Sequence, residues 1–198
     1  MLLEANNGMW DFTMFDSPDS AGVHRWPVLK LRAGSKCSGV LLGSRFLPLS
    51  SHWVGRTVPC PGENCRLCPI LPVRGLYYLP ISVEGRASIL EMSPVASANL
   101  EQHARLLHSG LTVGQLVEFS RRGAKSPIHA EIVEQRVGVN EVPFLMFVSR
   151  VMSLYHLPAA NPSESIEAYE KRLRAISLLR AEREYEQQMK RAAPHRVS

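Results

Sequence analysis

Apolar and polar residues alternate along much of the chain up to residue 135, which is the pattern of β-strands with one buried face. The segment Gly75–Val83 is the strongest case, because it is rich in aromatic and β-branched residues and Glu84-Gly85 follows as a turn. Gly43 interrupts the earlier alternation and favours a curved strand pair. We predict strands over residues 28–49, 75–83, 86–92, 114–122 and 128–134.

Helical spacing replaces this alternation in two segments. Ser93-Pro94 is typical of a helix start, with a serine cap followed by proline in the first turn, and it predicts a helix over residues 94–108. A second helix is predicted over residues 163–192, with Ser163 as its cap. Its apolar stripe weakens after residue 180, so we expect its first half to pack on its own domain, or the helix to contact a protein partner or a second copy.

The apolar stretch at residues 142–157 fits no single period. We predict a strand at 144–148 and a short helical segment at 149–155, followed by a linker.

Five strands with one helix before the last hairpin predict a mostly β, α+β fold. The expected architecture is an OB-like five-stranded barrel, in which the helix lies between the third and fourth strands. An SH3-like barrel or an open sheet fits the pattern nearly as well. We place this domain at residues 25–158, between an acidic, aromatic arm at 1–24 and a C-terminal helix and tail at 159–198.

The overall composition is that of a globular protein of one domain with an extension, or of two small domains. Of the 198 residues, 45% are hydrophobic, and no apolar run approaches the roughly 18 residues that cross a bilayer. The N-terminal residues lack the pattern of a secretory signal. We therefore expect a cytoplasmic protein in a reducing compartment, with no membrane partner.

Charge is distributed unevenly along the chain. The net charge is +5, but residues 21–75 hold eight basic residues and a single acid, Glu63. Most surfaces mix the two signs, so a merely solvated surface is the weaker explanation. A basic region of this size predicts contact with a polyanion such as nucleic acid.

Three of the four cysteines lie within this basic region. Cys60, Cys65 and Cys68 have the spacing C-x4-C-x2-C, and His52 precedes the first of them by eight residues. Three thiolates and one imidazole form a complete tetrahedral set for zinc, and prolines and glycine between them allow the chain to turn. Because four protein ligands leave no position for water, the expected Zn²⁺ site is structural rather than catalytic.

Other interpretations of these residues remain. The cysteines could be buried thiols, or two of them could form a disulfide, although turn residues rather than apolar periodicity surround them. Cys37 could replace His52 as the fourth ligand.

Single strands are bound by cations that follow the phosphates and by aromatic rings that stack on bases. The candidates for phosphate contact are Arg45, Arg56, Arg66, Arg74, Arg121, Arg122 and Lys125. The candidates for stacking are Phe46, Trp53, Tyr77, Tyr78 and Phe119. We favour Trp53, which is adjacent to a predicted ligand. Only one of the adjacent tyrosines can face outward, and both phenylalanines fit the core better than the surface.

The order of ligands and strands resembles the zinc-containing single-stranded DNA-binding proteins of T-even-type phages. The matching features are His52, Cys60, Cys65 and Cys68, the strand at 75–78 and the segment 89–94 that enters a helix. The resemblance covers roughly residues 28–136 and implies an OB-fold that binds single-stranded DNA. The ligand spacing is tighter here, the family's acidic C-terminal tail is missing, and the N-terminal arm is acidic, so partner recruitment and cooperative binding do not carry over.

These features predict a binding protein for single-stranded nucleic acid, DNA rather than RNA, that acts in replication, recombination or repair. The alternative is a zinc-stabilised adaptor that docks into a larger nucleic-acid complex through the helix at 163–192. Enzymatic activity is not expected, because the sequence lacks a carboxylate cluster, a phosphate-binding glycine loop and a Gly-x-Ser-x-Gly motif. A zinc deaminase needs glutamate two residues after the histidine, where Val54 stands.

Overall fold

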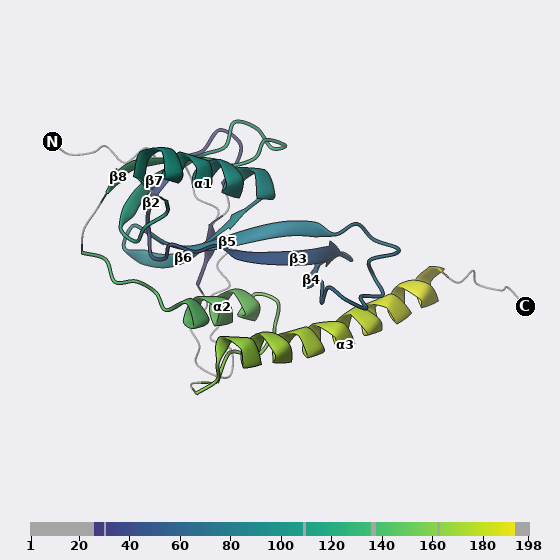
Figure 1. Ribbon diagram of the computed structural model, residues 1–198. Helices are drawn as coiled ribbons and strands as arrows, with labels where there is room; N and C mark the ends of the chain where they lie inside the picture. The colour runs from purple at the N-terminus through teal and green to yellow at the C-terminus, as the bar shows by residue number, and fades with distance from the viewer. Residues whose placement is uncertain (1–25, 30, 109, 136–137, 162, 193–198) are drawn as a thin grey trace, which may run out of the picture. The chain divides into compact units, whose positions relative to one another are not determined.

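A computed structural model describes residues 26–29, 31–108, 110–135, 138–161 and 163–192 (Figure 1). The predicted arm at 1–24 and the tail at 193–198 lie outside the described residues. The chain divides into two compact units. Among the described residues, the first unit comprises those up to residue 47 and those from 77 to 147, and the second comprises residues 48–76 and those from 148 to 192.

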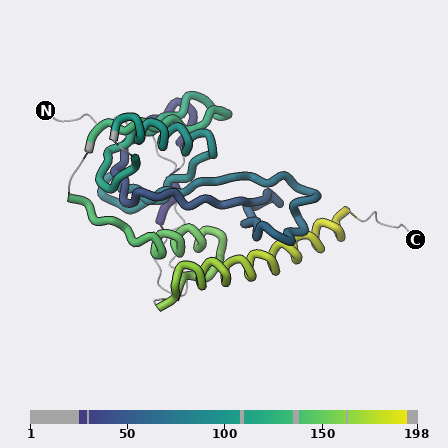
Figure 2. Tube along the Cα trace, in the orientation of Figure 1, coloured from purple at the N-terminus to yellow at the C-terminus, as the bar shows by residue number. Residues whose placement is uncertain are grey.

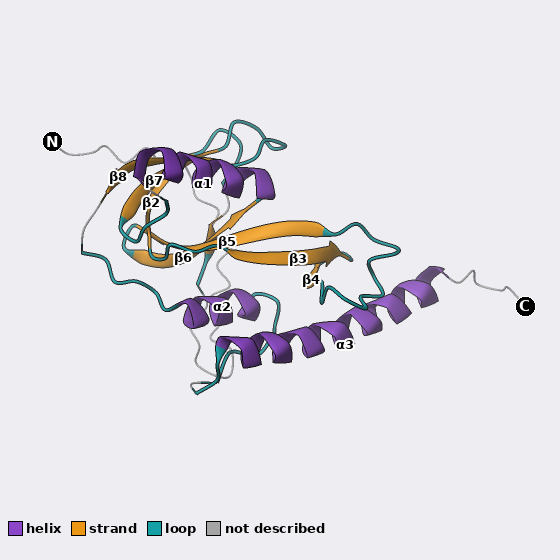
Figure 3. Cartoon of the chain, in the orientation of Figure 1, coloured by secondary structure: helices purple, strands orange, loops and turns teal. Residues whose placement is uncertain are grey.

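The first unit is built on a mixed β-sheet. Its strands are β1 (Val28–Leu29), β2 (Lys36–Leu41), β5 (Arg74–Val83), β6 (Arg86–Met92), β7 (Gln115–Ser120) and β8 (His129–Gln135) (Figure 3). They follow the order β1-β6-β5-β2-β7-β8, with β1 parallel to β6 and the other pairs antiparallel. Within the described residues no pairing joins β1 to β8. The sheet is therefore open, and the prediction of a closed barrel is not met.

The predicted turn at Glu84-Gly85 connects β5 to β6. Val83 pairs with Arg86, so the loop holds two residues. Their φ angles are 51° and 77°, and positive φ at both positions is what a tight type I′ hairpin requires. Glycine reaches this region without strain, so the local sequence alone sets the register of this strand pair.

Helix α1 (Pro94–His108) covers one face of this sheet. Ser93 caps it as predicted, because its Oγ accepts a hydrogen bond from the backbone N–H of Ala96 at 3.3 Å. Ala96, Leu100 and Ala104 repeat at every fourth position and are buried against β6 and β8. The core between helix and sheet also contains Phe119, which is fully buried.

Replacing Phe119 by alanine is expected to destabilise the first unit by roughly 3–5 kcal/mol, because the cavity adds to the lost burial. Phe119→Leu conserves most of the volume and is expected to cost less than about 1.5 kcal/mol. Chemical unfolding of both variants measures the difference. Nearly equal stabilities for the alanine variant and the unaltered protein would show that this ring is not a core element.

The second unit contains a short hairpin and a long helix. Strand β3 (Leu47–Trp53) pairs with β4 (Thr57–Pro59), and it also pairs with β5, whose first three residues belong to this unit. Helix α3 (Ile166–Ala192) is the long coil near the C-terminal end of the trace in Figure 2. Its buried residues, Tyr169, Leu173, Ser177, Ala181 and Glu184, recur every three or four positions and so form one stripe.

Helix α2 (Phe144–Ser153) replaces the strand that we predicted at 144–148. Phe147, Val148, Val151 and Met152 are buried at helical spacing, so the apolar run belongs to a helix throughout. The predicted helical segment at 149–155 was correct as far as residue 153. In the described part of the chain, no helix combines the length and the apolar character needed to cross a membrane.

The start of helix α3 differs from the prediction by a few residues. Ser165, not Ser163, is the cap, and its Oγ accepts a hydrogen bond from the N–H of Ala168 at 3.2 Å. Glu164 lies just outside the helix and accepts hydrogen bonds from Arg172 Nε at 2.9 Å and Nη2 at 2.7 Å. These bonds, with a further one from the Asn161 N–H, lower the pKa of Glu164 to about 2.

This shift makes the contribution of Glu164 depend on pH. A carboxyl whose pKa is lowered on folding adds stability above its unfolded pKa of about 4.5, and that stability is lost as the pH falls towards 2. Glu164→Gln is therefore expected to lower the melting temperature at pH 6 but not near pH 2. Thermal unfolding of both proteins across this range measures the difference. A gap in melting temperature that does not narrow below pH 4 would contradict this role.

Candidate metal centre

The β3–β4 hairpin and the turns after it bring four potential ligands together. His52 lies on β3, where it pairs with Val58. Cys60 directly follows β4, and its N–H donates to the Ser50 carbonyl at 2.7 Å, which extends the hairpin. The hairpin therefore fixes the first two ligands on neighbouring strands.

Two successive turns then present the remaining ligands. Gly62 and Asn64 have positive φ angles of 85° and 62°, which reverse the chain. The Cys65 N–H donates to the Gly62 carbonyl, and the Cys68 N–H donates to the Cys65 carbonyl, both at 3.3 Å. This turn brings the last two sulfurs of the C-x2-C step to the same side of the loop.

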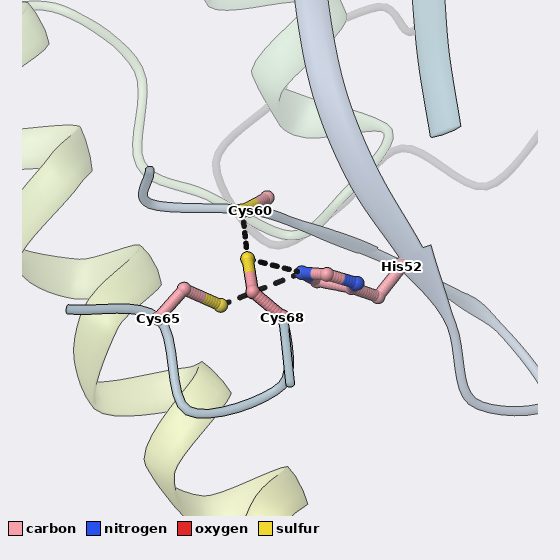
Figure 4. A group of neighbouring side chains, drawn as sticks. All are labelled: His52, Cys60, Cys65 and Cys68. Carbon is pink, nitrogen blue, oxygen red and sulfur yellow. Dashed lines mark hydrogen bonds between the residues drawn. The ribbon is translucent and has the colours of Figure 1, made fainter. Parts of the chain in front are cut away.

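The four side chains converge on one point, as Figure 4 shows. The Nε2 atom of His52 lies 3.4 Å from the sulfur of Cys65 and 3.6 Å from that of Cys68, and the sulfurs of Cys60 and Cys68 are 3.6 Å apart. All four ligand atoms lie within 4.8 Å of one another. A tetrahedral zinc ion would place two sulfurs roughly 3.8 Å apart, and sulfur and nitrogen about 3.5 Å apart. The three distances between ligand atoms given above are close to these separations.

The surroundings of the cluster fit a metal better than a set of ordinary thiols. His52 is completely buried, its Nε2 faces the sulfurs, and its Nδ1 has no hydrogen-bond partner within the described residues. All four cysteines are free, so no disulfide explains the arrangement. Burial raises the pKa of the Cys60 thiol to about 12, with further contributions from Cys68 and Cys65. A divalent cation would reverse this effect, since coordinated thiols lose their protons.

Cys37 is not part of the cluster. It lies on β2 in the core of the first unit, and it is buried there beside residues such as Phe119. Burial raises the pKa of its thiol to about 12, and the charge of Glu84 adds to the effect. The ligand set therefore contains His52, as we favoured, rather than the alternative Cys37.

The C-terminal half of helix α3 supports the zinc loop. Leu67 and Cys65 are buried in one apolar cluster with Ala181, and Tyr185 packs against it. The guanidinium group of Arg66 lies 4.5 Å from the centre of the Tyr185 ring. The first half of this helix is buried, as we expected, at Tyr169, Leu173 and Ser177. The packing of its second half on the zinc loop was not expected.

An ion pair adds to this contact. Arg56, in the turn between β3 and β4, donates a hydrogen bond to the carboxylate of Glu184, which is almost completely buried. Sequence reasoning did not select Ala181, Glu184 or Tyr185. Their spacing of three and four residues marks one helical face, but nothing in the sequence indicates which surface that face covers.

Trp53 is the most accessible of the aromatic candidates. It follows His52 on β3, and since side chains alternate along a strand, the buried imidazole directs the indole outward. Trp53 is 51% exposed, and the guanidinium group of Arg74 lies 5.8 Å from its ring centre. Single-strand binding uses exposed rings and nearby cations, so Trp53 with Arg74 stays a candidate for stacking.

Three other aromatic candidates are buried, which agrees with the expectation that both phenylalanines and one of the two tyrosines belong to the core. Phe46, Tyr78 and Phe119 are at most 8% exposed, so their rings offer no face for stacking. Tyr77 is partly exposed but meets Phe46 edge-on, with 6.1 Å between ring centres. The structure thus leaves Trp53 and part of Tyr77 as stacking candidates.

The basic candidates in the first unit differ in what they contact. Arg45 lies over the Phe144 ring at 4.3 Å and is exposed. Arg121 donates hydrogen bonds to three backbone carbonyls. Its guanidinium group therefore stabilises the surrounding loops and is less available to bind a phosphate. Arg122 and Lys125 are exposed near the tip of the β7–β8 hairpin.

Comparisons of the chain with protein-family models, with curated proteins and with solved structures give no match.

Proposed function

We propose that this protein binds single-stranded nucleic acid, preferring DNA to RNA, and acts in DNA replication, recombination or repair. A structural zinc ion would hold the stacking surface in place. The observation that carries the proposal is the position of Trp53, which is exposed beside Arg74 and adjacent to a metal ligand. The DNA preference rests on the resemblance to the phage proteins.

The zinc module would act by reducing the entropy cost of binding. Four bonds to one zinc ion would fix the loop, which the packing of Leu67 on Ala181 also holds. Trp53, Arg66 and Arg74 then need little ordering when a strand arrives, which is the benefit of a preformed site. The surrounding excess of positive charge supports the same proposal, because it attracts a polyanion of any sequence.

The connections of the first unit support an OB-like arrangement. Its first long strand, β2, pairs with β5 and also with β7, and α1 lies between β6 and β7 in the chain. We take this strand order as support for an OB-like arrangement, because OB-folds are often only partly closed and bind oligonucleotides on their strands and loops.

Titration of a labelled oligo(dT) with zinc-loaded protein tests the proposal. Binding should rise with oligomer length and weaken with salt, with a slope of roughly −1.4 in a log–log plot of the binding constant against salt concentration if Arg66 and Arg74 each contact one phosphate. Duplex of the same length is expected to bind more weakly, because its bases cannot stack on Trp53. No binding at low salt, or tighter binding of the duplex, would contradict the proposal.

A second candidate is the adaptor function, in which the zinc module docks on another protein. Its support is the exposure of three apolar side chains in this module, Trp53, Ile70 and Val73, at 51%, 46% and 51%. Helix α3, within the predicted segment 163–192, would then be a further contact for a partner or for a second copy. Absence of oligonucleotide binding together with a specific protein partner at this surface would favour this function.

A further inference from the structure

The first unit contains a cavity that the proposed function does not use. It lies on the face of strands β2, β7 and β8 and has a volume of about 400 Å³. The charged and titratable side chains that line it are Lys36, Glu118, Arg121, Arg122, His129 and Glu131. Cys37 and Val117, which are the neighbours of Lys36 and Glu118 along their strands, are buried in the core, so the cavity is on the outer face of the sheet.

Strand register orders the charges within the cavity. Ser120 pairs with Lys36 on one side and with His129 on the other, which forms a basic row. Two residues further along β7, Glu118 pairs with Ser38 and with Glu131, which forms an acidic row. Rows two residues apart on one face are separated by roughly 7 Å. The cavity therefore has a basic end and an acidic end.

The basic end is built around a fixed loop. The guanidinium group of Arg121 donates to the carbonyls of Ser126 at 3.1 Å and Leu31 at 3.0 Å, and also to that of Ala124. Its backbone carbonyl accepts the N–H of Gly34 at 2.7 Å. Arg121 thus connects the β7–β8 turn to the segment before β2, and these bonds hold the basic end of the cavity in place without a ligand.

Two cations at this end remain available. Arg122 is exposed, and among the described residues its guanidinium group has no hydrogen bond or ion pair. The ammonium group of Lys36 is exposed as well, and its charge acts on Glu131. A guanidinium and an ammonium group at one end of a cavity are the usual partners of a phosphate, since guanidinium binds two of its oxygens at once.

The acidic end favours a ligand that donates hydrogen bonds. Glu131 accepts a hydrogen bond from His129 Nε2 at 2.8 Å, and this bond lowers the pKa of Glu131, so the carboxylate stays ionised at neutral pH. Ionised carboxylates only accept hydrogen bonds. Glu118 is exposed to the cavity, and the two oxygens of its carboxylate can accept hydrogen bonds from the adjacent N1–H and N2–H groups of a guanine.

We propose that this cavity binds a guanine nucleotide, with the phosphate between Lys36 and Arg122 and the base edge against Glu118. The volume suits a single nucleotide, and the two ends of the cavity carry the charges that complement the two ends of this ligand. The site lies within the first unit and does not depend on Trp53, so it can be tested separately from single-strand binding.

Calorimetric titration of the full zinc-loaded chain with GMP, dTMP and inorganic phosphate tests the assignment. GMP is expected to bind saturably and more tightly than dTMP. Arg122→Gln should weaken GMP and phosphate binding about tenfold, because a charged hydrogen bond to phosphate is lost. Glu118→Gln should weaken GMP binding but leave phosphate binding unchanged. Both side chains are exposed, so the melting temperatures of these variants should stay close to that of the unaltered protein.

Arg105→Gln is the matched control, because Arg105 lies on α1 in the same unit, is exposed, and forms an ion pair with the neighbouring Glu101. It should bind GMP as the unaltered protein does. Absence of saturable GMP binding, or equal losses for Arg105→Gln and Arg122→Gln, would overturn the assignment. A 5′-phosphorylated oligonucleotide that begins with guanine shows whether the nucleotide bound by the cavity is free or is the end of a strand. Competition of this oligonucleotide with GMP indicates the end of a strand. No competition indicates a free nucleotide.

Discussion

Replacing Cys65 by serine is expected to abolish stoichiometric zinc binding and to unfold the zinc loop. Cys65 is a buried ligand, and it also joins the apolar cluster that holds the loop on helix α3. Binding of structural zinc contributes roughly 10–16 kcal/mol in small zinc domains, where it is inseparable from folding. The loss should therefore exceed the effect of any single core substitution. Metal analysis and thermal unfolding measure the two consequences.

Cys37→Ala is the control for this prediction. Cys37 is the one cysteine outside the cluster, and it is buried in the first unit. Its removal can lower the stability of that unit, but the zinc content should remain at one per chain. Full zinc content in Cys65→Ser, or equal zinc loss in both variants, would contradict the ligand assignment.

Replacing Trp53 by alanine is expected to weaken oligo(dT) binding by about tenfold to a hundredfold. The reason is that stacking of a base on an aromatic ring contributes roughly 1–3 kcal/mol. Trp53→Phe keeps an aromatic face and should retain most of the affinity. Because the indole is half exposed and is not a ligand, zinc content and melting temperature should stay nearly unchanged. Fluorescence anisotropy with a labelled oligonucleotide measures the affinities.

Arg74→Gln tests the contribution of the cation to binding separately from that of the Trp53 ring. It should reduce the slope of the salt dependence by about 0.7, which is the effect of one phosphate contact on a single strand. Arg105→Gln, on the first unit, serves as the control and should leave the slope unchanged. Unaltered affinity in Trp53→Ala would remove the central support for single-strand binding and would favour the adaptor function.

Local features of the fold were predictable from the sequence. Helix α1 and strand β6 have the predicted bounds, because a serine cap and a two-residue turn fix their ends. The clustering of the four candidate ligands was also predictable, since all of them fall within a short segment whose turns bring them together. In these cases the determining contacts are close in sequence.

Features that depend on distant contacts were not predictable. Arg56 and Glu184 are 128 positions apart, and no pattern near either residue indicates the other. The strand predicted at 144–148 failed because a short apolar run fits a buried strand and a buried helix equally well. Closure of the sheet depends on whether its two end strands meet, and alternation along each strand carries no information about that.

The face of the sheet that a given strand residue occupies was harder to predict. The sequence requires that Tyr77 and Tyr78 face opposite sides, but it does not say which one faces the core. Tyr78 is the buried one, and its hydroxyl donates to Glu91 at 3.1 Å. The outward direction of Trp53 was easier to predict, because the neighbouring His52 was expected to face inward as a metal ligand.

The most direct test of the zinc centre is X-ray absorption spectroscopy at the zinc edge of the purified, zinc-loaded protein. The structure predicts one zinc ion per chain, with three sulfur neighbours at about 2.3 Å and one nitrogen neighbour at about 2.0 Å. Four sulfur neighbours, or a shell of oxygen and nitrogen alone, would contradict the assignment of His52, Cys60, Cys65 and Cys68 as a closed structural site.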